Sequence, residues 1–209
     1  LAISALFTLL AVYCASNNFS LIEISFTTFL LAFSGAISQW PIGYISDQFD
    51  RRKVIVIIAL GAAISAYLLS QYTIAINEQN TSKLIFYGLI FVYSFLCMPI
   101  YSLCMSHTND LIEKENIVSA GAGLNFLYGV GAIFGPVLCA AFMNYYGPSG
   151  FFTFIMMTHI CTILYGVHRI FVKKGVVSDN SFVAVPRAAS PLALELSPEA
   201  DPMPPENKS

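Results

Sequence analysis

Charged residues are scarce in this sequence. Asp, Glu, Lys and Arg make up 11% of the 209 residues, whereas a typical soluble domain contains about 25%. Hydrophobic residues make up 56%, and the mean hydropathy is +0.70. The net charge of -2, without a large basic cluster, gives no support for a nucleic-acid-binding surface. The composition therefore predicts an integral membrane protein and argues against an ordinary soluble enzyme.

Closely spaced cysteines in polar loops, which disulfide frameworks and metal sites need, are also absent. The cysteines lie inside apolar runs, where we interpret them as free thiols that pack as small apolar side chains. They are Cys14, Cys97, Cys104, Cys139 and Cys161. These runs contain no HExxH motif, no pair of acids and no Ser-His-Asp grouping. We therefore predict no enzymatic activity, no catalytic residue, no metal and no cofactor.

Long apolar runs follow one another along the chain. The runs are 1–16, 25–46, 54–76, 84–106, 117–143 and 150–172. A helix of about 20 apolar residues crosses the hydrocarbon core and satisfies its own backbone. We therefore predict an all-α fold, a polytopic six-helix transmembrane bundle over residues 1–172. The first run is short and opens directly at Leu1, so we expect its beginning to lie outside this sequence.

Basic residues fall almost entirely on one side of this predicted bundle. One side carries Arg51, Arg52, Lys53, Lys114, Arg169, Lys173 and Lys174, and the other carries Lys83. Because Lys and Arg concentrate in cytoplasmic loops, we place the C-terminus in the cytoplasm. Residues 173–209 are rich in proline and acid, which predicts a disordered cytoplasmic tail. A regulatory or docking role for this tail is the alternative interpretation.

A cluster of charges lies in the segment GYISDQFDRRK, from Gly43 to Lys53. Asp47 is placed where a helix meets water, within reach of Arg51 and Arg52, and its carboxylate could also face the N-terminus of a neighbouring helix. Such a gating cluster could hold one conformation closed. The alternative is a basic loop that only sets topology, with a solvated acid beside it.

This segment resembles motif A of the major facilitator superfamily. Together with QWPIG and NDLIEKENIVSAGAGLNFLYGVGAIFGP, it looks most like the YcaD-type permeases of bacteria. The resemblance implies a secondary active transporter in a bacterial inner membrane. The spacings of the apolar runs and of these motifs resemble those of helices seven to twelve in a twelve-helix fold. The resemblance therefore implies that the N-terminal six-helix half is missing from this chain and that Asp47 would contact that half. Gln48 and Asp50 depart from the motif, which usually has a basic residue and a glycine there.

The fourth run carries a polar stripe, and we expect this stripe to face protein or a water-filled cavity. It contains Tyr87, Ile90, Ser94, Cys97, Tyr101 and Cys104, whereas Ile85, Leu89, Val92, Leu96, Ile100 and Leu103 are expected to face lipid. The matching family helix lines the central path, which makes Ser94 and Tyr101 candidates for contact with a small-molecule substrate, together with Tyr13. An interior hydroxyl bonded to a neighbouring helix is the alternative.

Gly131 and Gly135 in the fifth run form a GxxxG pair followed by Pro136. Small residues let transmembrane helices approach closely, and proline permits a bend. This pattern resembles the interface helices of the family and suggests a contact with the missing half. Packing inside one half is the alternative.

Gln39, Asn125 and His159 are polar groups within apolar runs, and each needs a structural or functional partner. We prefer Asn125 as the functional member and expect His159 to be structural. No Asp or Glu lies deep in any run, so ion or proton coupling would reside in the missing half. The sequence thus predicts alternating-access transport of a small solute. A membrane sensor or scaffold with the same fold is the alternative.

Overall fold

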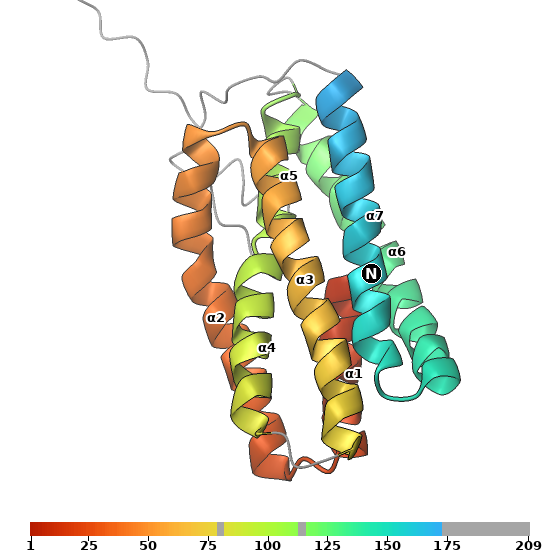
Figure 1. The fold of residues 1–209 in the computed structure, drawn as a ribbon. Coiled ribbons are helices and arrows are strands. Elements are labelled where there is room, and N and C mark those ends of the chain that lie inside the picture. Colours follow the sequence, from red (N-terminus) through yellow and green to blue (C-terminus); the bar gives the residue numbers. More distant parts are fainter. Residues whose placement is uncertain (79–81, 113–115, 173–209) are drawn as a thin grey trace, which may run out of the picture.

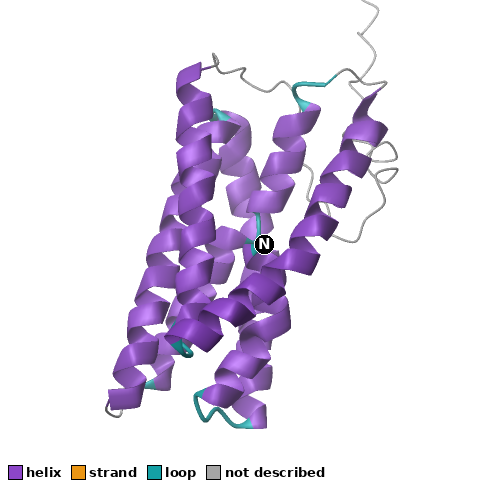
Figure 2. Cartoon of the chain, turned by 90° about the vertical axis from the view of Figure 1, so that its right-hand side faces the viewer, coloured by secondary structure: helices purple, strands orange, loops and turns teal. Residues whose placement is uncertain are grey.

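The computed structural model describes residues 1–78, 82–112 and 116–172, and within them it contains helices and no strand. The helices are α1 (Ala2–Ser16), α2 (Leu21–Gln48), α3 (Arg51–Glu78), α4 (Lys83–Cys97), α5 (Ile100–Asn109), α6 (Ile117–Tyr146) and α7 (Gly150–Val172). Figure 1 shows them as a bundle in which α3 packs against both α4 and α7. In the view turned by 90°, short loops join the helices at both ends of the bundle (Figure 2).

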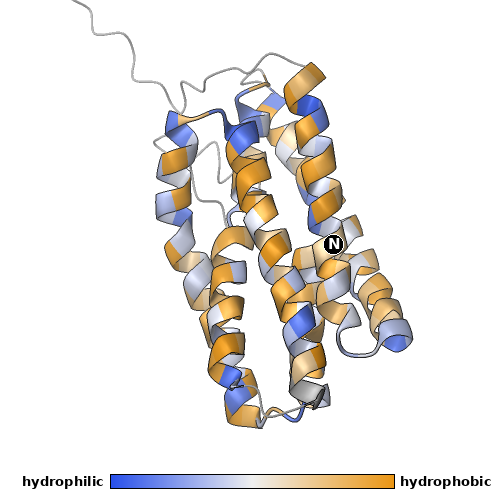
Figure 3. Ribbon diagram, in the orientation of Figure 1, coloured by the Kyte–Doolittle hydropathy of each residue, from blue (hydrophilic) through white to orange (hydrophobic). Residues whose placement is uncertain are grey.

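The predicted all-α membrane fold is confirmed for the described residues. Each predicted apolar run is helical, and the segments long and apolar enough to cross a membrane are α2, most of α3, α4 together with α5, α6 and α7. Helix α1, with 15 residues, is shorter. Figure 3 shows hydrophobic residues along the lengths of the helices and hydrophilic ones gathered at their ends. The predicted tail, and Lys114 with it, lie outside the described residues.

The fourth predicted helix is interrupted at Met98 and Pro99, between α4 and α5. Both residues keep backbone angles in the right-handed helical region. The Met98 N–H still donates to the Ser94 carbonyl at 3.0 Å, but Pro99 has no N–H with which to continue the ladder. The interruption is therefore a local loss of hydrogen bonding caused by proline.

The expected lipid-facing stripe of this helix is wrong at Leu103, which is completely buried. Leu103 packs in a cluster with Ile42, Val54, Ile55 and Ile58 of α2 and α3. On the other side of the proline, Ile85 and Val92 are exposed as expected. Leu89 and Leu96, before the break, are partly buried and also pack against the core, so the expected lipid-facing stripe holds only in part on either side of Pro99.

Aromatic side chains fill the core where α1, α4 and α7 meet. The Tyr13 ring lies 5.1 Å from Phe151, 4.9 Å from Phe152 and 6.0 Å from Phe86, measured between centroids. All four side chains are essentially inaccessible. Aromatic pairs at these separations contribute about 0.5–1.5 kcal/mol each beyond their buried area.

The glycine pair in α6 packs against α1 of the same chain. A Cβ at Gly131 would lie 3.0 Å from the Leu1 nitrogen, and one at Gly135 would overlap Ser4. The Ser4 hydroxyl donates to the Gly131 carbonyl at 2.9 Å. These glycines thus serve a contact within the bundle, whereas Pro136 is only partly buried.

Another glycine fixes the position of the α4–α5 junction. A Cβ at Gly35 of α2 would lie 2.5 Å from the Cγ of Met98. The Ser94 hydroxyl donates to the Leu31 carbonyl at 2.6 Å nearby. Helix α4 is therefore held against α2 by close packing and by a hydrogen bond between the helices.

This packing predicts different effects for the same substitution in two neighbouring helices. Gly35→Leu should lower the thermal unfolding midpoint of the purified protein, because overpacking costs about 1–3 kcal/mol. Gly88→Leu is the matched control, since a Cβ at Gly88 meets nothing within 4 Å, and leucine favours a helix over glycine by up to about 1 kcal/mol. Circular dichroism in detergent measures both midpoints, and equal midpoints would contradict the role of the Gly35 contact.

Candidate functional site

Charged side chains meet at the end of the bundle where α2 ends and α3 begins. We call Asp47, Asp50, Arg51, Arg52 and Asp110 the charge cluster. Asp47 lies in the last turn of α2, the two arginines open α3, and Asp110 caps the C-terminus of α5. The cluster lies near the upper end of the molecule in Figure 1. Three helices therefore contribute to one charged site.

Arg51 is the centre of the charge cluster, and its side chain is only 3% exposed. Its Nη2 lies 2.9 Å from Asp47 Oδ1, as the sequence predicted, and its Nε lies 3.3 Å from Asp110 Oδ2. Asp110 is 8% exposed. The contact with Asp47 is a charge-assisted hydrogen bond, a kind that is stronger than a neutral one, whereas the contact of Nε with Asp110 is a close approach of opposite charges. One buried guanidinium thus joins the ends of α2, α3 and α5.

Arg52 pairs with Asp50 at 2.7 Å. The Arg52 Nε and backbone N–H also donate to Asp50 Oδ1, at 3.1 and 3.0 Å. The hydrogen bond from the Arg52 side chain lowers the pKa of the Asp50 carboxyl below its usual value. Asp50, which departs from the family pattern, is therefore the residue that engages Arg52.

The Arg52 Nη1 donates in addition to the Arg169 carbonyl, at 3.4 Å. This bond ties the start of α3 to the last turn of α7. Gly43, one turn before Asp47, is buried, and its carbonyl accepts a bond of 2.7 Å from the Ser46 hydroxyl. The predicted gating residues thus lie at one end of the bundle, where Asp47 pairs with Arg51 and Asp50 pairs with Arg52.

Asp110 was missed by the sequence analysis. The sequence feature that could have indicated Asp110 is its place just after the fourth run, on the same predicted side of the membrane as Arg51. The two residues are 59 positions apart, so only the packing of α5 against α3 brings them together. A rule based on neighbouring positions in one helix does not detect such a pair.

Two of the predicted pathway residues are brought together between α5 and α6. The Tyr101 hydroxyl donates to Asn125 Oδ1 at 2.6 Å. The ring of Tyr128 lies 5.6 Å from that of Tyr101. All three side chains are half-buried, so this contact forms an uncharged, partly exposed polar group between the two helices.

The other two candidates, Tyr13 and Ser94, lie elsewhere in the core. Tyr13 is 1% exposed and bonds to the Thr73 hydroxyl, and Ser94 is wholly buried and bonds to the Leu31 carbonyl. Both hydroxyls therefore have interior partners on neighbouring helices, the arrangement that the alternative interpretation describes. Neither lies beside Tyr101 and Asn125.

His159 and Gln39, the remaining polar groups singled out in the apolar runs, each form a hydrogen bond, but Oε1 of Gln39 is buried without one. His159 Nε2 lies 3.1 Å from the Tyr93 hydroxyl, which in turn donates to Cys97 Sγ at 3.2 Å. Gln39 donates to the Gly35 carbonyl at 3.4 Å. His159 is 4% exposed, so its contact with Tyr93 meets the requirement that a buried polar group be bonded.

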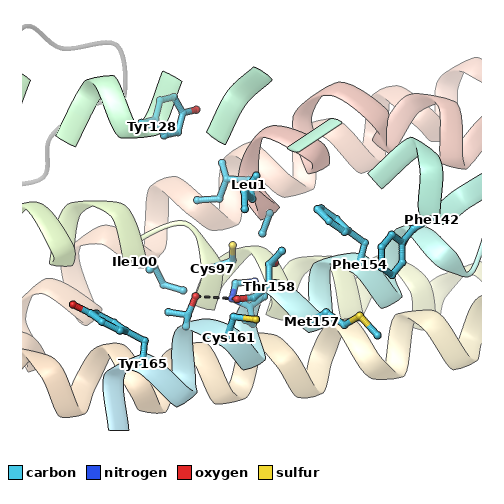
Figure 4. Close-up of a pocket in the computed structure, with 14 residues that line it drawn as sticks. Leu1, Cys97, Ile100, Tyr128, Phe142, Phe154, Met157, Thr158, Cys161 and Tyr165 are labelled. Carbon is cyan, nitrogen blue, oxygen red and sulfur yellow. Dashed lines mark hydrogen bonds between the residues drawn. The ribbon is translucent and has the colours of Figure 1, made fainter. Parts of the chain in front are cut away.

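A cavity of about 640 Å³ opens beside His159. Its lining comes from α1, α4, α5, α6 and α7 and includes Cys97, Tyr128, Thr158 and Tyr165 (Figure 4). Most lining side chains are apolar. The lining contains Tyr128 of the polar site but none of the four predicted pathway residues.

Comparison with known proteins gives a family match over most of the chain. The sequence model of the Major Facilitator Superfamily matches residues 1–194. An uncharacterized MFS-type transporter YcaD of Escherichia fergusonii is 23% identical over 163 residues, which cover 78% of this chain and 39% of the relative.

Two further relatives show the same coverage. The YcaD protein of Escherichia coli K12 is 25% identical over 167 residues, which cover 78% of this chain and 39% of its own length. An uncharacterized MFS-type transporter of Yersinia enterocolitica is 24% identical over 165 residues, which cover 77% of this chain and 39% of the relative. The chain therefore spans about two fifths of the length of these relatives. No solved structure matches the chain significantly.

The burial of the charge cluster predicts that Arg51→Gln destabilises the protein. Removing one partner of a buried ion pair costs about 3–5 kcal/mol, because the other charge stays buried without compensation. Lys53→Gln, which removes the same charge from an exposed position, should leave the unfolding midpoint in neutral detergent unchanged. Thermal unfolding followed by circular dichroism compares the two. Equal midpoints would show that Arg51 contributes no more than a solvated cation.

Proposed function

This chain belongs to the Major Facilitator Superfamily, and we propose that it forms one six-helix half of a secondary transporter that moves a small solute by alternating access. The observation that carries this proposal is the family match over residues 1–194. The family indicates a multi-pass membrane transporter rather than an enzyme, and the apolar helices agree with a place in the lipid bilayer.

The second half of such a transporter would come from a part of the protein outside this chain. The relatives are about two and a half times as long as the matched segment. Transporters of this type place their substrate between two halves near the middle of the membrane. We propose that an N-terminal six-helix half completes this arrangement.

We propose that the charge cluster holds the bundle in one conformation. Arg51 bonds the ends of α2 and α5 to α3, and Arg52 bonds α3 to α7. Breaking such bonds in one state and keeping them in the other would bias a two-state equilibrium. Of the acids Asp47, Asp50, Asp110 and Glu23, Asp47 has the most exposed side chain, at 31%, which suits a carboxylate that also meets the opposite half.

The contact between Tyr101 and Asn125 is our proposed substrate-facing site. It is uncharged, it joins two helices and it is accessible from outside the described core. No Asp or Glu lies deep within the described helices. Coupling to an ion or a proton, if the transporter uses it, would therefore depend on the half outside this chain.

The proposed orientation predicts which loops an impermeant thiol reagent reaches in intact cells. In a protein whose own cysteines are replaced, a cysteine at Ser82 should be labelled from outside and one at Lys53 should be shielded. The reason is the excess of Lys and Arg at the Lys53 end, which is retained in the cytoplasm. Permeabilised cells provide the control, because both positions should then react. Labelling at Lys53 in intact cells would overturn the orientation.

The gating role predicts that Asp47→Asn impairs transport by the intact protein that contains this chain. Charge-assisted bonds contribute about 1.5–3 kcal/mol, which corresponds to about a 10- to 150-fold change in a two-state equilibrium. Because Arg51 keeps its second partner, Asp110, we expect the lower end of this range. Transport should fall at normal expression, and a cysteine at Gln39 should react faster from the cytoplasmic side.

Asp50→Asn is the matched control for this experiment. It removes the same charge from the same cluster but affects Arg52, not Arg51. Transport is expected to fall less in this control variant than in Asp47→Asn, because Arg52 keeps its bond to the Arg169 carbonyl. If Asp47→Asn leaves transport and accessibility unchanged, the gating role is wrong and the loop acts only in topology.

A further inference from the structure

Two cations at the charge-cluster end of the molecule form no ion pair within the described residues. Lys53 is exposed in the first turn of α3, and Arg169 is half-buried in the last turn of α7. The neighbouring acids Asp47 and Asp110 are bound to Arg51, and Asp50 is bound to Arg52. Among the described residues, no carboxylate is bonded to Lys53 or Arg169 to offset its positive charge.

Both cations lie along the seam between α3 and α7. A Cβ at Gly166 would lie 2.6 Å from Val56 Cγ2, so the two helices approach closely at this level. Lys53 is three residues before Val56, and Arg169 is three residues after Gly166. Residues three apart in a helix share a face, and α3 and α7 run in opposite directions (Figure 1). Lys53 and Arg169 thus flank the seam on the same side of this contact.

The bond between Arg52 and the Arg169 carbonyl holds α3 and α7 together at the level of Lys53 and Arg169. It joins the two helices at 3.4 Å, one turn beyond the contact of Val56 with Gly166. Lys53 follows Arg52 directly in α3, and Arg169 itself accepts the bond through its backbone. The spacing of the two cationic side chains is therefore set by a braced pair of helices rather than by a loop.

The surroundings of the seam are those of a membrane boundary. Below the cations, Ile57 is 66% exposed on α3, and Leu164 and Tyr165 are each 66% exposed on α7. Exposed apolar side chains on a spanning helix face acyl chains, and tyrosine is favoured at headgroup level. In Figure 3 the start of α3 is hydrophilic, and hydrophilic residues also lie near the upper end of α7, just before its hydrophobic tip.

We propose that Lys53 and Arg169 bind the headgroup of an anionic phospholipid, with its acyl chains along the α3–α7 seam. Arginine can donate two parallel bonds to a phosphate, and lysine adds a mobile point charge. Basic pockets between transmembrane helices bind anionic headgroups in this way. The single negative charge of the headgroup would offset one of the two positive charges, and the lipid would cover the seam beside the bond from Arg52 to the Arg169 carbonyl. The proposal concerns lipid binding alone and does not depend on the transport function.

Native mass spectrometry tests this proposal on the intact protein that contains this chain, purified in neutral detergent. The probe is an equimolar mixture of phosphatidylglycerol and phosphatidylcholine. From about 1 kcal/mol for each cation near an anionic surface, we expect a preference of about 10- to 30-fold for phosphatidylglycerol. The double variant Lys53→Gln, Arg169→Gln should reduce this preference to near onefold. The exchange Lys53→Arg, Arg169→Lys keeps both charges and should retain most of it.

Two further measurements make the result decisive. The unfolding midpoint without lipid checks that the double variant is folded. If the double variant is not folded, Lys53→Gln alone, at an exposed position, should still reduce the preference for phosphatidylglycerol severalfold. Soluble glycerol phosphate at millimolar concentration should not displace the lipid. An undiminished preference in the neutral variants, equal binding of both lipids to the wild type, or displacement by glycerol phosphate would each overturn the proposal. Because no transport is measured, failure here is separate from failure of the proposed function.

Discussion

Hydrocarbon offers no hydrogen-bond partner to a peptide group, and this constraint shapes every spanning segment of the chain. The helices satisfy their own backbone, and many hydroxyl groups bond within the same helix. Thr73, Thr108 and Thr162, for example, donate to carbonyls four residues earlier. The hydroxyls that are not used in this way, such as those of Ser94 and Tyr101, bond to a neighbouring helix instead. The polar chemistry of the bundle interior therefore consists of a few contacts between helices.

Charge is confined to the ends of the helices, where water and headgroups can solvate it. At one end Glu23 and Lys83 join α2 to α4 at 2.7 Å, and at the other the charge cluster joins α2, α3 and α5. The two ends differ in exposure: Lys83 is 37% exposed, whereas Arg51 is 3% exposed. Exposed pairs contribute about 0–1 kcal/mol, but a buried pair leaves an uncompensated charge when it is broken. The Arg51 end is therefore the one at which a change of a single carboxylate has structural consequences.

The sequence predicted the helices because long apolar runs have few other solutions in a membrane. It also predicted that Asp47 lies within reach of Arg51 and Arg52; Asp47 bonds to Arg51, and Arg52 engages Asp50. It did not predict Asp110 as a partner, since that contact requires the packing of α5 against α3. Nor could it separate Tyr13 and Ser94 from Tyr101 and Asn125. A polar stripe looks the same whether it meets a buried helix contact or a partly exposed one, and only the exposure of these side chains in the structure distinguishes the two.

The break at Pro99 has a mechanical consequence for the fourth apolar segment. Its first part, α4, is fastened to α2 through Ser94 and through Met98 over Gly35. Its second part, α5, is fastened to α6 through Tyr101 and to α3 through Asp110. Because α4 is bonded to α2 while α5 is bonded to α6 and α3, the segment cannot keep all these contacts if α2 and α6 move apart. Any shift of α6 relative to α2 must therefore bend the segment at Pro99 or break one of these contacts.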